Sequence, residues 1–311
     1  MRKVQKILVP IDFSDASGSA LDYALMLAPR LGAAVTALFV SPQHAWYEQL
    51  PAFPRPEPLD PARRRRLEED LRRFVTRSGS AQPVADVVLR EGDPADEILA
   101  QAANSEADLI VLGTHGRRRF ERWSLGSVVD RVAREAERPV LTVPPHLRAP
   151  VIARVLCAVD LSDFSAETLE HGFALAQVME ARLAVLYVAE GTHWYEPWPI
   201  SGVDPQAVRQ AIAESARQRL SELVAHHVPE GFPVEVSVTV GRAQREVVRV
   251  AGEGADLVVL GVRSTHGVDR LFFGSTAQHV LRAGICPVLL VRQPRTAASE
   301  PHPTEGAAGP S

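Results

Sequence analysis

Apolar residues follow two alternating patterns along the first half of the chain. Short runs rich in Val, Ile and Leu, typical of buried parallel strands, span 5–11, 34–40, 84–89, 108–113 and 140–143. Between these runs, apolar residues recur at the spacing of amphipathic helices over 20–31, 63–77, 96–103 and 127–137. Gly32 supplies a typical end for the first of these helices. Strands that alternate with helices in this way predict an α/β fold with a doubly wound, five-stranded parallel sheet.

The second half of the chain repeats this order, up to a last apolar run over 288–291. Asp12 and Asp160 lie 148 positions apart, and so do Gly126 and Gly274. A register held over the whole unit indicates a tandem duplication. We therefore predict one domain over 1–146, a second over 152–293, and a tail over 294–311 whose Pro, Ala, Gly and Glu content favours disorder.

A glycine-rich segment follows the fourth apolar run. Gly113 is separated by two residues from Gly116, which is separated by nine from Gly126, and Ser127 comes next. Glycine lets the backbone approach a ligand closely, and the N-terminus of the helix that begins at Ser127 offers unpaired N–H groups to an anion. Isolated glycines after a strand are usually turn formers. Three of them with a serine, placed between strand and helix, favour a phosphate-binding loop.

Asp12 closes the first predicted strand. In a doubly wound sheet, ligands bind beyond the carboxyl ends of the strands, at the point where the strand order reverses. If the first and fourth strands are neighbours, Asp12 and Gly113 face one crevice. The alternative is that Asp12 caps the helix that begins near Ser14. One residue is able to serve both roles.

Together these parts resemble the universal stress protein family over nearly the whole chain, as two tandem domains. The most specific element is the family's nucleotide signature, Gly-x2-Gly-x9-Gly-Ser/Thr, which Gly113, Gly116, Gly126 and Ser127 match in full. The opening VPIDFSDAS and the ending ERPVLTVP of the first half are also similar to that family. The resemblance implies the strand order 3-2-1-4-5.

The resemblance further implies ATP as the ligand, often with a divalent metal ion such as Mg²⁺ or Mn²⁺ on the phosphates. It places the base near Pro10, Asp12 and the backbone of Val40. The ribose and phosphate contacts that it implies are Gly113, Gly116, Gly126, Ser127 and Val128.

The second half departs from this signature. Ser264 stands where the pattern asks for its second glycine, and Ala158 replaces the proline of the first half. A non-glycine residue rarely adopts the positive φ that such a position can require. The positions that keep their residue type are Asp160, Gly261, Gly274 and Ser275. We therefore predict that the second site binds nucleotide more weakly than the first, or not at all.

Composition and charge exclude several classes of function and partner. The 311 residues carry a formal net charge of −4, so no overall positive field attracts nucleic acid. The two cysteines, Cys157 and Cys286, form no CxxC pair, which argues against a zinc site and suits a reducing compartment. The apolar run at the N-terminus ends at Asp12, too short for a signal peptide or a membrane span. A cytoplasmic protein without membrane or nucleic-acid partners is expected.

Several conspicuous residues receive weaker interpretations. The arginines at 117–119 lie inside the glycine-rich segment, where a solvated loop is at least as good an account as phosphate contact. His115 lies in the same segment without a recognisable Ser or Cys nucleophile beside it, which favours a loop histidine near the phosphates over a catalytic one. Neither GxxxxGK[ST] nor GxGxxG occurs, so a P-loop ATPase and an NAD enzyme lack support. The triplet Trp-Tyr-Glu at 46–48 recurs at 194–196. A lid over the ligand, a contact between the halves and ordinary loop packing are all open for it.

The resulting expectation is a regulator that binds ATP in its first half and responds to stress through partners, without turnover. No residue is assigned a catalytic or metal-ligating role. The alternatives are a slow ATP hydrolase or autophosphorylating enzyme, for which Asp12 and His115 are the residues to test, and an interaction scaffold without a ligand. The halves are expected to pack as a pseudo-twofold pair along the strands that end at Val143 and Val291, and a homodimer is a further possibility.

Overall fold

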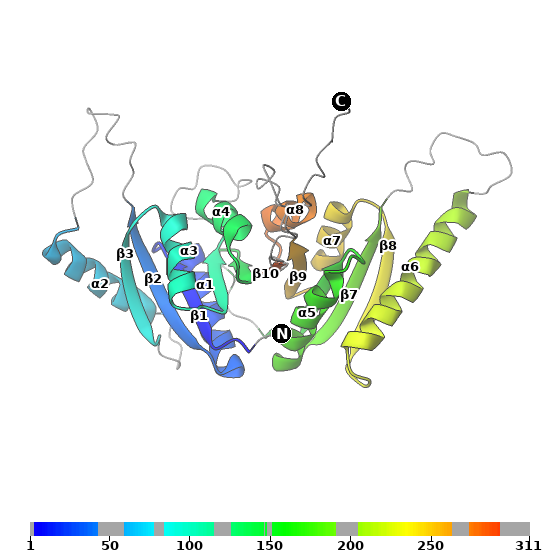
Figure 1. The fold of residues 1–311 in the computed structure, drawn as a ribbon, viewed down its shortest axis with the longest axis horizontal. Coiled ribbons are helices and arrows are strands. Elements are labelled where there is room, and N and C mark those ends of the chain that lie inside the picture. Colours follow the sequence, from blue (N-terminus) through cyan, green and yellow to red (C-terminus); the bar gives the residue numbers. More distant parts are fainter. Residues whose placement is uncertain are drawn as a thin grey trace, which may run out of the picture.

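The strands of both halves join in a single ten-stranded sheet in the computed structural model of the protein (Figure 1). The structure describes residues 3–42, 59–77, 84–114, 126–145, 147, 151–190, 205–262 and 274–292. The first half comprises β1 (Lys6–Ile11), α1 (Asp15–Leu31), β2 (Ala34–Pro42), α2 (Pro61–Thr76), β3 (Asp86–Gly92), α3 (Pro94–Asn104), β4 (Leu109–Gly113), α4 (Ser127–Glu135) and β5 (Val140–Val143). The second half comprises β6 (Arg154–Val159), α5 (Ser165–Val178), β7 (Arg182–Ala189), α6 (Pro205–His227), β8 (Val234–Val240), α7 (Ala243–Gly252), β9 (Leu257–Val262), α8 (Ser275–Ala283) and β10 (Val288–Arg292).

Each half has the predicted doubly wound topology. The strand order is β3-β2-β1-β4-β5 in the first half and β8-β7-β6-β9-β10 in the second, which is 3-2-1-4-5 in both. The paired strands within each half are parallel. The predicted α/β class, the five strands per half and their order are thus confirmed.

The two halves meet along β5 and β10, the strands at which the contact between them was expected. These strands pair antiparallel, with Leu141 opposite Leu289 and Val140 opposite Leu290. Thr142 adds a side-chain hydrogen bond to the carbonyl of Val288, at 3.2 Å. The antiparallel junction gives the ten strands a pseudo-twofold arrangement about the middle of the sheet.

Helices cover both faces of the sheet. The helices α1, α2, α5 and α6 pack their apolar sides into one continuous core on the first face. The helices α3, α4, α7 and α8 form the core on the opposite face. Both cores run across the boundary between the halves, as expected of a parallel sheet that is buried on both sides.

Both ends of α1 have residues that suit a helix terminus. Ser14 caps α1, its hydroxyl accepting from the N–H of Ser17 at 3.2 Å. The helix ends at Gly32, whose φ of 67° lies in the left-handed region that glycine adopts without strain.

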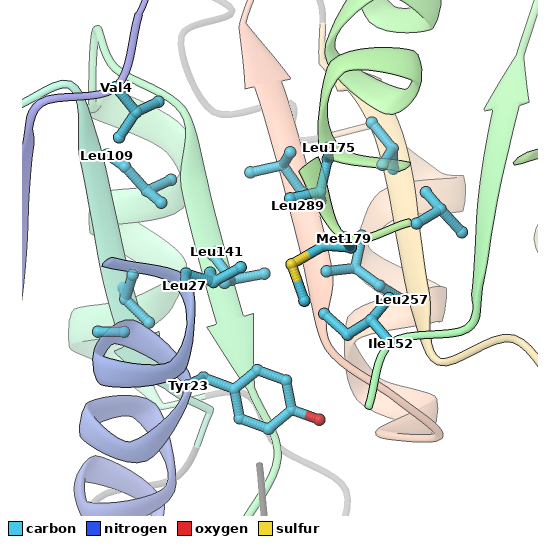
Figure 2. Close-up of a cluster of buried hydrophobic side chains, with 14 of the residues drawn as sticks. Val4, Tyr23, Leu27, Leu109, Leu141, Ile152, Leu175, Met179, Leu257 and Leu289 are labelled. Carbon is cyan, nitrogen blue, oxygen red and sulfur yellow. The ribbon is translucent and has the colours of Figure 1, made fainter. Parts of the chain in front are cut away.

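Figure 2 shows the apolar cluster between the halves. The side chains of Leu27, Leu109 and Leu141 lie across from those of the second half. The counterparts of these three at the repeat distance are Leu175, Leu257 and Leu289. Tyr23 belongs to the same cluster and is fully buried, although its counterpart in the second half is a histidine, His171.

No helix within the described residues has both the length and the apolar character needed to cross a membrane.

Candidate functional site

A crevice opens where the strand order of the first half reverses. β1 lies between β2 and β4, and the carboxyl ends of β1 and β4 open into a cavity of about 700 Å³. The predicted site residues that line this cavity are Pro10, Asp12, Val40, Gly113, Gly126, Ser127 and Val128. The structure therefore gathers every described member of the predicted first site into one cavity at the switch point, which is where doubly wound sheets bind ligands.

The turn after β1 fixes the carboxylate at the edge of this cavity. Asp12 accepts from the backbone N–H of Ser14 at 3.0 Å and from the Ser14 hydroxyl. The cap of α1 is thus Ser14, and Asp12 orients that cap instead of acting as the cap itself. Phe13 between them adopts a φ of 63°, an unusual conformation for a bulky residue, and its ring packs against Phe39 with a centroid distance of 5.0 Å.

Gly113 has a structural reason to be glycine. A Cβ at this position would lie 2.4 Å from the carbonyl carbon of Ala16 and 2.5 Å from its oxygen. The missing side chain lets the first turn of α1 pack directly on the end of β4. This contact alone accounts for the glycine, and it also brings the N-terminus of α1 to the edge of the cavity.

The N-terminus of α4 faces the same cavity without a side-chain cap. Gly126 is its N-cap residue and provides no capping side chain, whereas Ser14, Asp60 and Asp93 cap α1, α2 and α3. Ser127 and Val128 of the first turn line the cavity. Uncapped N–H groups and the positive end of the helix dipole make such a terminus attractive to an anion.

The charged residues around the cavity are balanced. Among its described lining residues the charged side chains are Asp12, Asp130, Arg134 and Arg282. Asp130 and Arg134 form an ion pair at 2.6 Å within α4, and both side chains are about a quarter exposed (26% and 22%). Arg282 comes from α8, in the other half of the protein.

The second half has an equivalent cavity of about 540 Å³. It is lined by all four site residues predicted there: Asp160, Gly261, Gly274 and Ser275. The turn after β6 repeats the first one, since Asp160 accepts from the N–H of Ser162 at 3.0 Å and Leu161 has a φ of 56°. The N-terminus of α8 likewise lacks a side-chain cap.

The lining of the second cavity differs in shape and charge. A Cβ on Gly261 would meet the Thr168 hydroxyl at 2.5 Å and the ring of Phe164 at 3.1 Å, so side chains occupy the space that the backbone of Ala16 takes in the first half. The charged residues of the described lining are Asp160 and Glu190, both acidic. Glu190 accepts from the backbone N–H of Ala243 at 2.6 Å and so serves the N-terminus of α7.

Some predicted features lie outside the described residues. These are Gly116, Ser264, His115, the arginines at 117–119, and the Trp-Tyr-Glu triplets at 46–48 and 194–196. Within the part of the chain that is described, no group of three or more His, Cys, Asp or Glu side chains is arranged to hold a metal ion.

Sequence reasoning missed several polar residues of the first cavity, among them Asp130, Arg134, Gln278 and Arg282. Arg134 stands on the polar side of α4, and its spacing from Asp130 was the available signal. Gln278 and Arg282 reach this cavity from α8, a helix of the second half. Only the pairing of β5 with β10 brings that helix near, and neither residue carries a motif.

Two parallel sheets of order 3-2-1-4-5, each with a crevice at its switch point, place the chain in the class of doubly wound, Rossmann-like α/β proteins. The model of the universal stress protein family matches residues 3–144 and again 152–292. The chain therefore belongs to the universal stress protein family, as a member with two domains in tandem.

Individual relatives agree with this assignment. Universal stress protein MT2698 of Mycobacterium tuberculosis is 30% identical over 309 residues, which cover 93% of this chain and 97% of that protein. Universal stress protein MJ0531 of Methanocaldococcus jannaschii is 35% identical over 142 residues, 45% of this chain and 81% of that protein. The crystal structure of a universal stress protein from Archaeoglobus fulgidus shares the fold with a TM-score of 0.64, at 20% identity, covering 94% of this chain and 99% of that one.

Proposed function

We propose that this protein binds ATP in the cavity of its first half and acts as a nucleotide-dependent regulator of the stress response in the cytoplasm. The observation that carries the proposal is the uncapped N-terminus of α4, which opens onto a cavity of about 700 Å³ with Asp12 at its edge. A cavity of this size falls within the range that holds small organic ligands and cofactors.

The residues of the cavity fit the parts of a nucleotide. Pro10, Leu38 and Val40 offer an apolar wall to a base, and Asp12 offers an acceptor to its polar edge or to a ribose hydroxyl. Ser127 and the N–H groups at the start of α4 suit phosphate oxygens. A divalent ion such as Mg²⁺ or Mn²⁺ would be held chiefly by the phosphates themselves.

The second cavity is proposed to bind nucleotide weakly or not at all. Its described charged lining, Asp160 and Glu190, repels phosphates, whereas the first cavity includes arginines. The side chains of Phe164 and Thr168 also stand close to Gly261, where the first half has the backbone and Cβ of Ala16. One ATP per chain is expected.

The matched variants Gly126→Val and Gly274→Val test the assignment. A Cβ at Gly126 would lie at ordinary distances of 3.6 Å from the carbonyl oxygen of Thr114 and 3.9 Å from Val129 Cγ2, and a Cβ at Gly274 would meet nothing within 4 Å. Neither position has positive φ, so both variants should fold. Calorimetric titration with ATP should show one site in the wild type, none after Gly126→Val, and an unchanged site after Gly274→Val. Equal losses in both variants, or none in Gly126→Val, would contradict the proposed site.

The fate of the nucleotide separates regulator from enzyme. Purified protein is denatured, and the released nucleotides are resolved by chromatography at increasing times of incubation. ATP that persists supports a binding protein, whereas ADP or AMP that accumulates supports a slow hydrolase. If no nucleotide is released and none binds on titration, the scaffold alternative holds.

A further inference from the structure

The cavity of the first half is completed by the second half. All but two of its described lining residues belong to the first half, and the exceptions are Gln278 and Arg282 of α8. These two side chains stand one helical turn apart, so both point to the same side of α8. The bound ligand would therefore contact both halves of the protein.

The first half contributes no described residue to the cavity of the second half. The residues equivalent to Gln278 and Arg282 at the repeat distance are Asp130 and Arg134 of α4. A strictly symmetric pair would bring them to the second cavity, yet they line their own. The described lining of the second cavity consists of second-half residues alone and contains no arginine or lysine.

The charge of Arg282 is available to a ligand. Arg134 is engaged in its ion pair with Asp130. Arg282 is exposed and makes no ion pair within the described residues. A guanidinium group suits phosphate because its planar set of donors matches two phosphate oxygens at once.

We propose that Arg282 of the second half binds the distal phosphates of the nucleotide in the first half, and so makes the site selective for triphosphates. The inference rests on the proposed nucleotide function and adds to it a specificity-determining residue. The phosphate nearest the ribose is held by the start of α4, and the chain of phosphates extends from there toward α8. ATP reaches Arg282, whereas AMP does not. Binding of ATP therefore also ties the two halves together across their junction.

The test is calorimetric titration of wild type, Arg282→Ala and Arg282→Lys with ATP, ADP and AMP. Arg245→Ala is the matched control, because Arg245 is an exposed arginine on α7 that lines neither nucleotide cavity. We expect Arg282→Ala to weaken ATP binding about tenfold, equivalent to about 1.4 kcal/mol, and to leave AMP binding unchanged. Arg282→Lys should show a smaller loss for ATP, and Arg245→Ala no loss for any nucleotide.

Two results would overturn the inference while leaving the nucleotide site in place. One is unchanged ATP affinity in Arg282→Ala. The other is an equal loss for ATP and AMP, which would mean that Arg282 does not read the distal phosphates. A wild-type protein that binds none of the three nucleotides would instead overturn the proposed function itself. Because Arg282 is exposed, its replacement should leave the thermal unfolding midpoint of the ligand-free protein unchanged, and this is checked first.

Discussion

The two crevices share a turn and differ in the residues that follow it. Asp12 and Asp160 each accept from the N–H two residues later, and the next residues, Phe13 and Leu161, have φ values of 63° and 56°. The helices then start at different places. α1 begins at Asp15, whereas α5 begins at Ser165, the equivalent of Ser17.

The crevices differ where Ala16 in the first half corresponds to Phe164 in the second. Ala16 is small enough to lie inside the helix against Gly113. Phe164 instead precedes its helix, and its ring is buried beside Gly261. The cores and the strand order tolerate this change completely. A duplicated fold can therefore keep its architecture while the lining of its two crevices diverges.

The largest expected difference between the halves is the loss of stability when the glycine of each crevice, Gly113 or Gly261, is replaced by alanine. Gly113→Ala should destabilise the protein by about 3 kcal/mol, because the new Cβ clashes with backbone that moves only if α1 moves. Gly261→Ala should cost about 1 kcal/mol, because the clashing atoms belong to the side chains of Thr168 and Phe164. Urea denaturation of both variants measures the free energies of unfolding. Equal costs would mean that the two crevices are packed alike.

The second effect concerns the thiol of Cys157, whose counterpart in the first half is Val9. Burial raises the pKa of Cys157 from 9.0 to about 12. The folded state thus keeps a proton that the unfolded state releases above pH 9. This contribution to the free energy of unfolding is fully present below pH 9 and is lost as the pH rises toward 12. The loss reaches about 2–3 kcal/mol by pH 11.

The variant Cys157→Val, which copies the first half, should remove this loss. Its unfolding free energy is measured from pH 8 to pH 11 and compared with that of the wild type. Cys286, whose pKa burial also raises to about 12, stays in both proteins and supplies the same slope to each. Parallel curves for the two proteins would contradict the assignment of the effect to Cys157.

A smaller difference is expected at the helices that follow β3 and β8. Asp93 caps α3 by accepting from the N–H groups of Ala95 and Asp96, at 3.0 and 3.2 Å. Arg242 occupies the same position before α7 and makes no side-chain cap. Asp93→Ala should therefore cost about 1 kcal/mol and Arg242→Ala close to nothing. Thermal unfolding of the two variants compares them directly, and a larger loss for Arg242→Ala would exclude this account.

The smallest effect is expected where Tyr23 meets the second half. Its hydroxyl is buried and has no hydrogen-bond partner within the described residues. Tyr23→Phe removes this unpaired group and should raise the unfolding free energy by up to about 1 kcal/mol at neutral pH. Burial also raises the pKa of Tyr23 above 10.0, so the variant should lose less stability than the wild type as pH rises past 10. A destabilised variant would show that the hydroxyl has a partner in solution.

The alternation of apolar patterns was enough to predict a doubly wound α/β sheet with five strands per half, because buried parallel strands and amphipathic helices have distinct periods. The strand order came from the resemblance to the family and not from the periodicity. The end of β3 was placed too early, at Leu89, because the polar Arg90 and Glu91 interrupt the apolar run. β3 is an edge strand of the sheet, and Arg90 belongs to it, with its side chain donating to Gln101 of α3 at 2.9 Å.

The part of the candidate site that lies in one continuous segment of sequence was predictable. The part that depends on packing between distant helices and strands was not. Glycines and a serine at fixed spacing mark the strand-to-helix connection, and the repeat locates their counterparts. The late start of α5 was hidden, because Phe164 reads as one more apolar residue in the pattern. The reach of Arg282 into the other half depends on how α8 lies across the junction of β5 and β10, which no local pattern encodes.

The antiparallel junction of β5 with β10 makes the pairing of the two halves independent of the protein concentration. Two separate domains that pair along an edge strand come apart on dilution. Here both strands belong to one polypeptide, so the effective concentration of one half for the other is set by the connecting segment and not by the cell. Pairing survives at any expression level. Occupancy of the proposed site, which both halves line, would then report the ligand concentration alone.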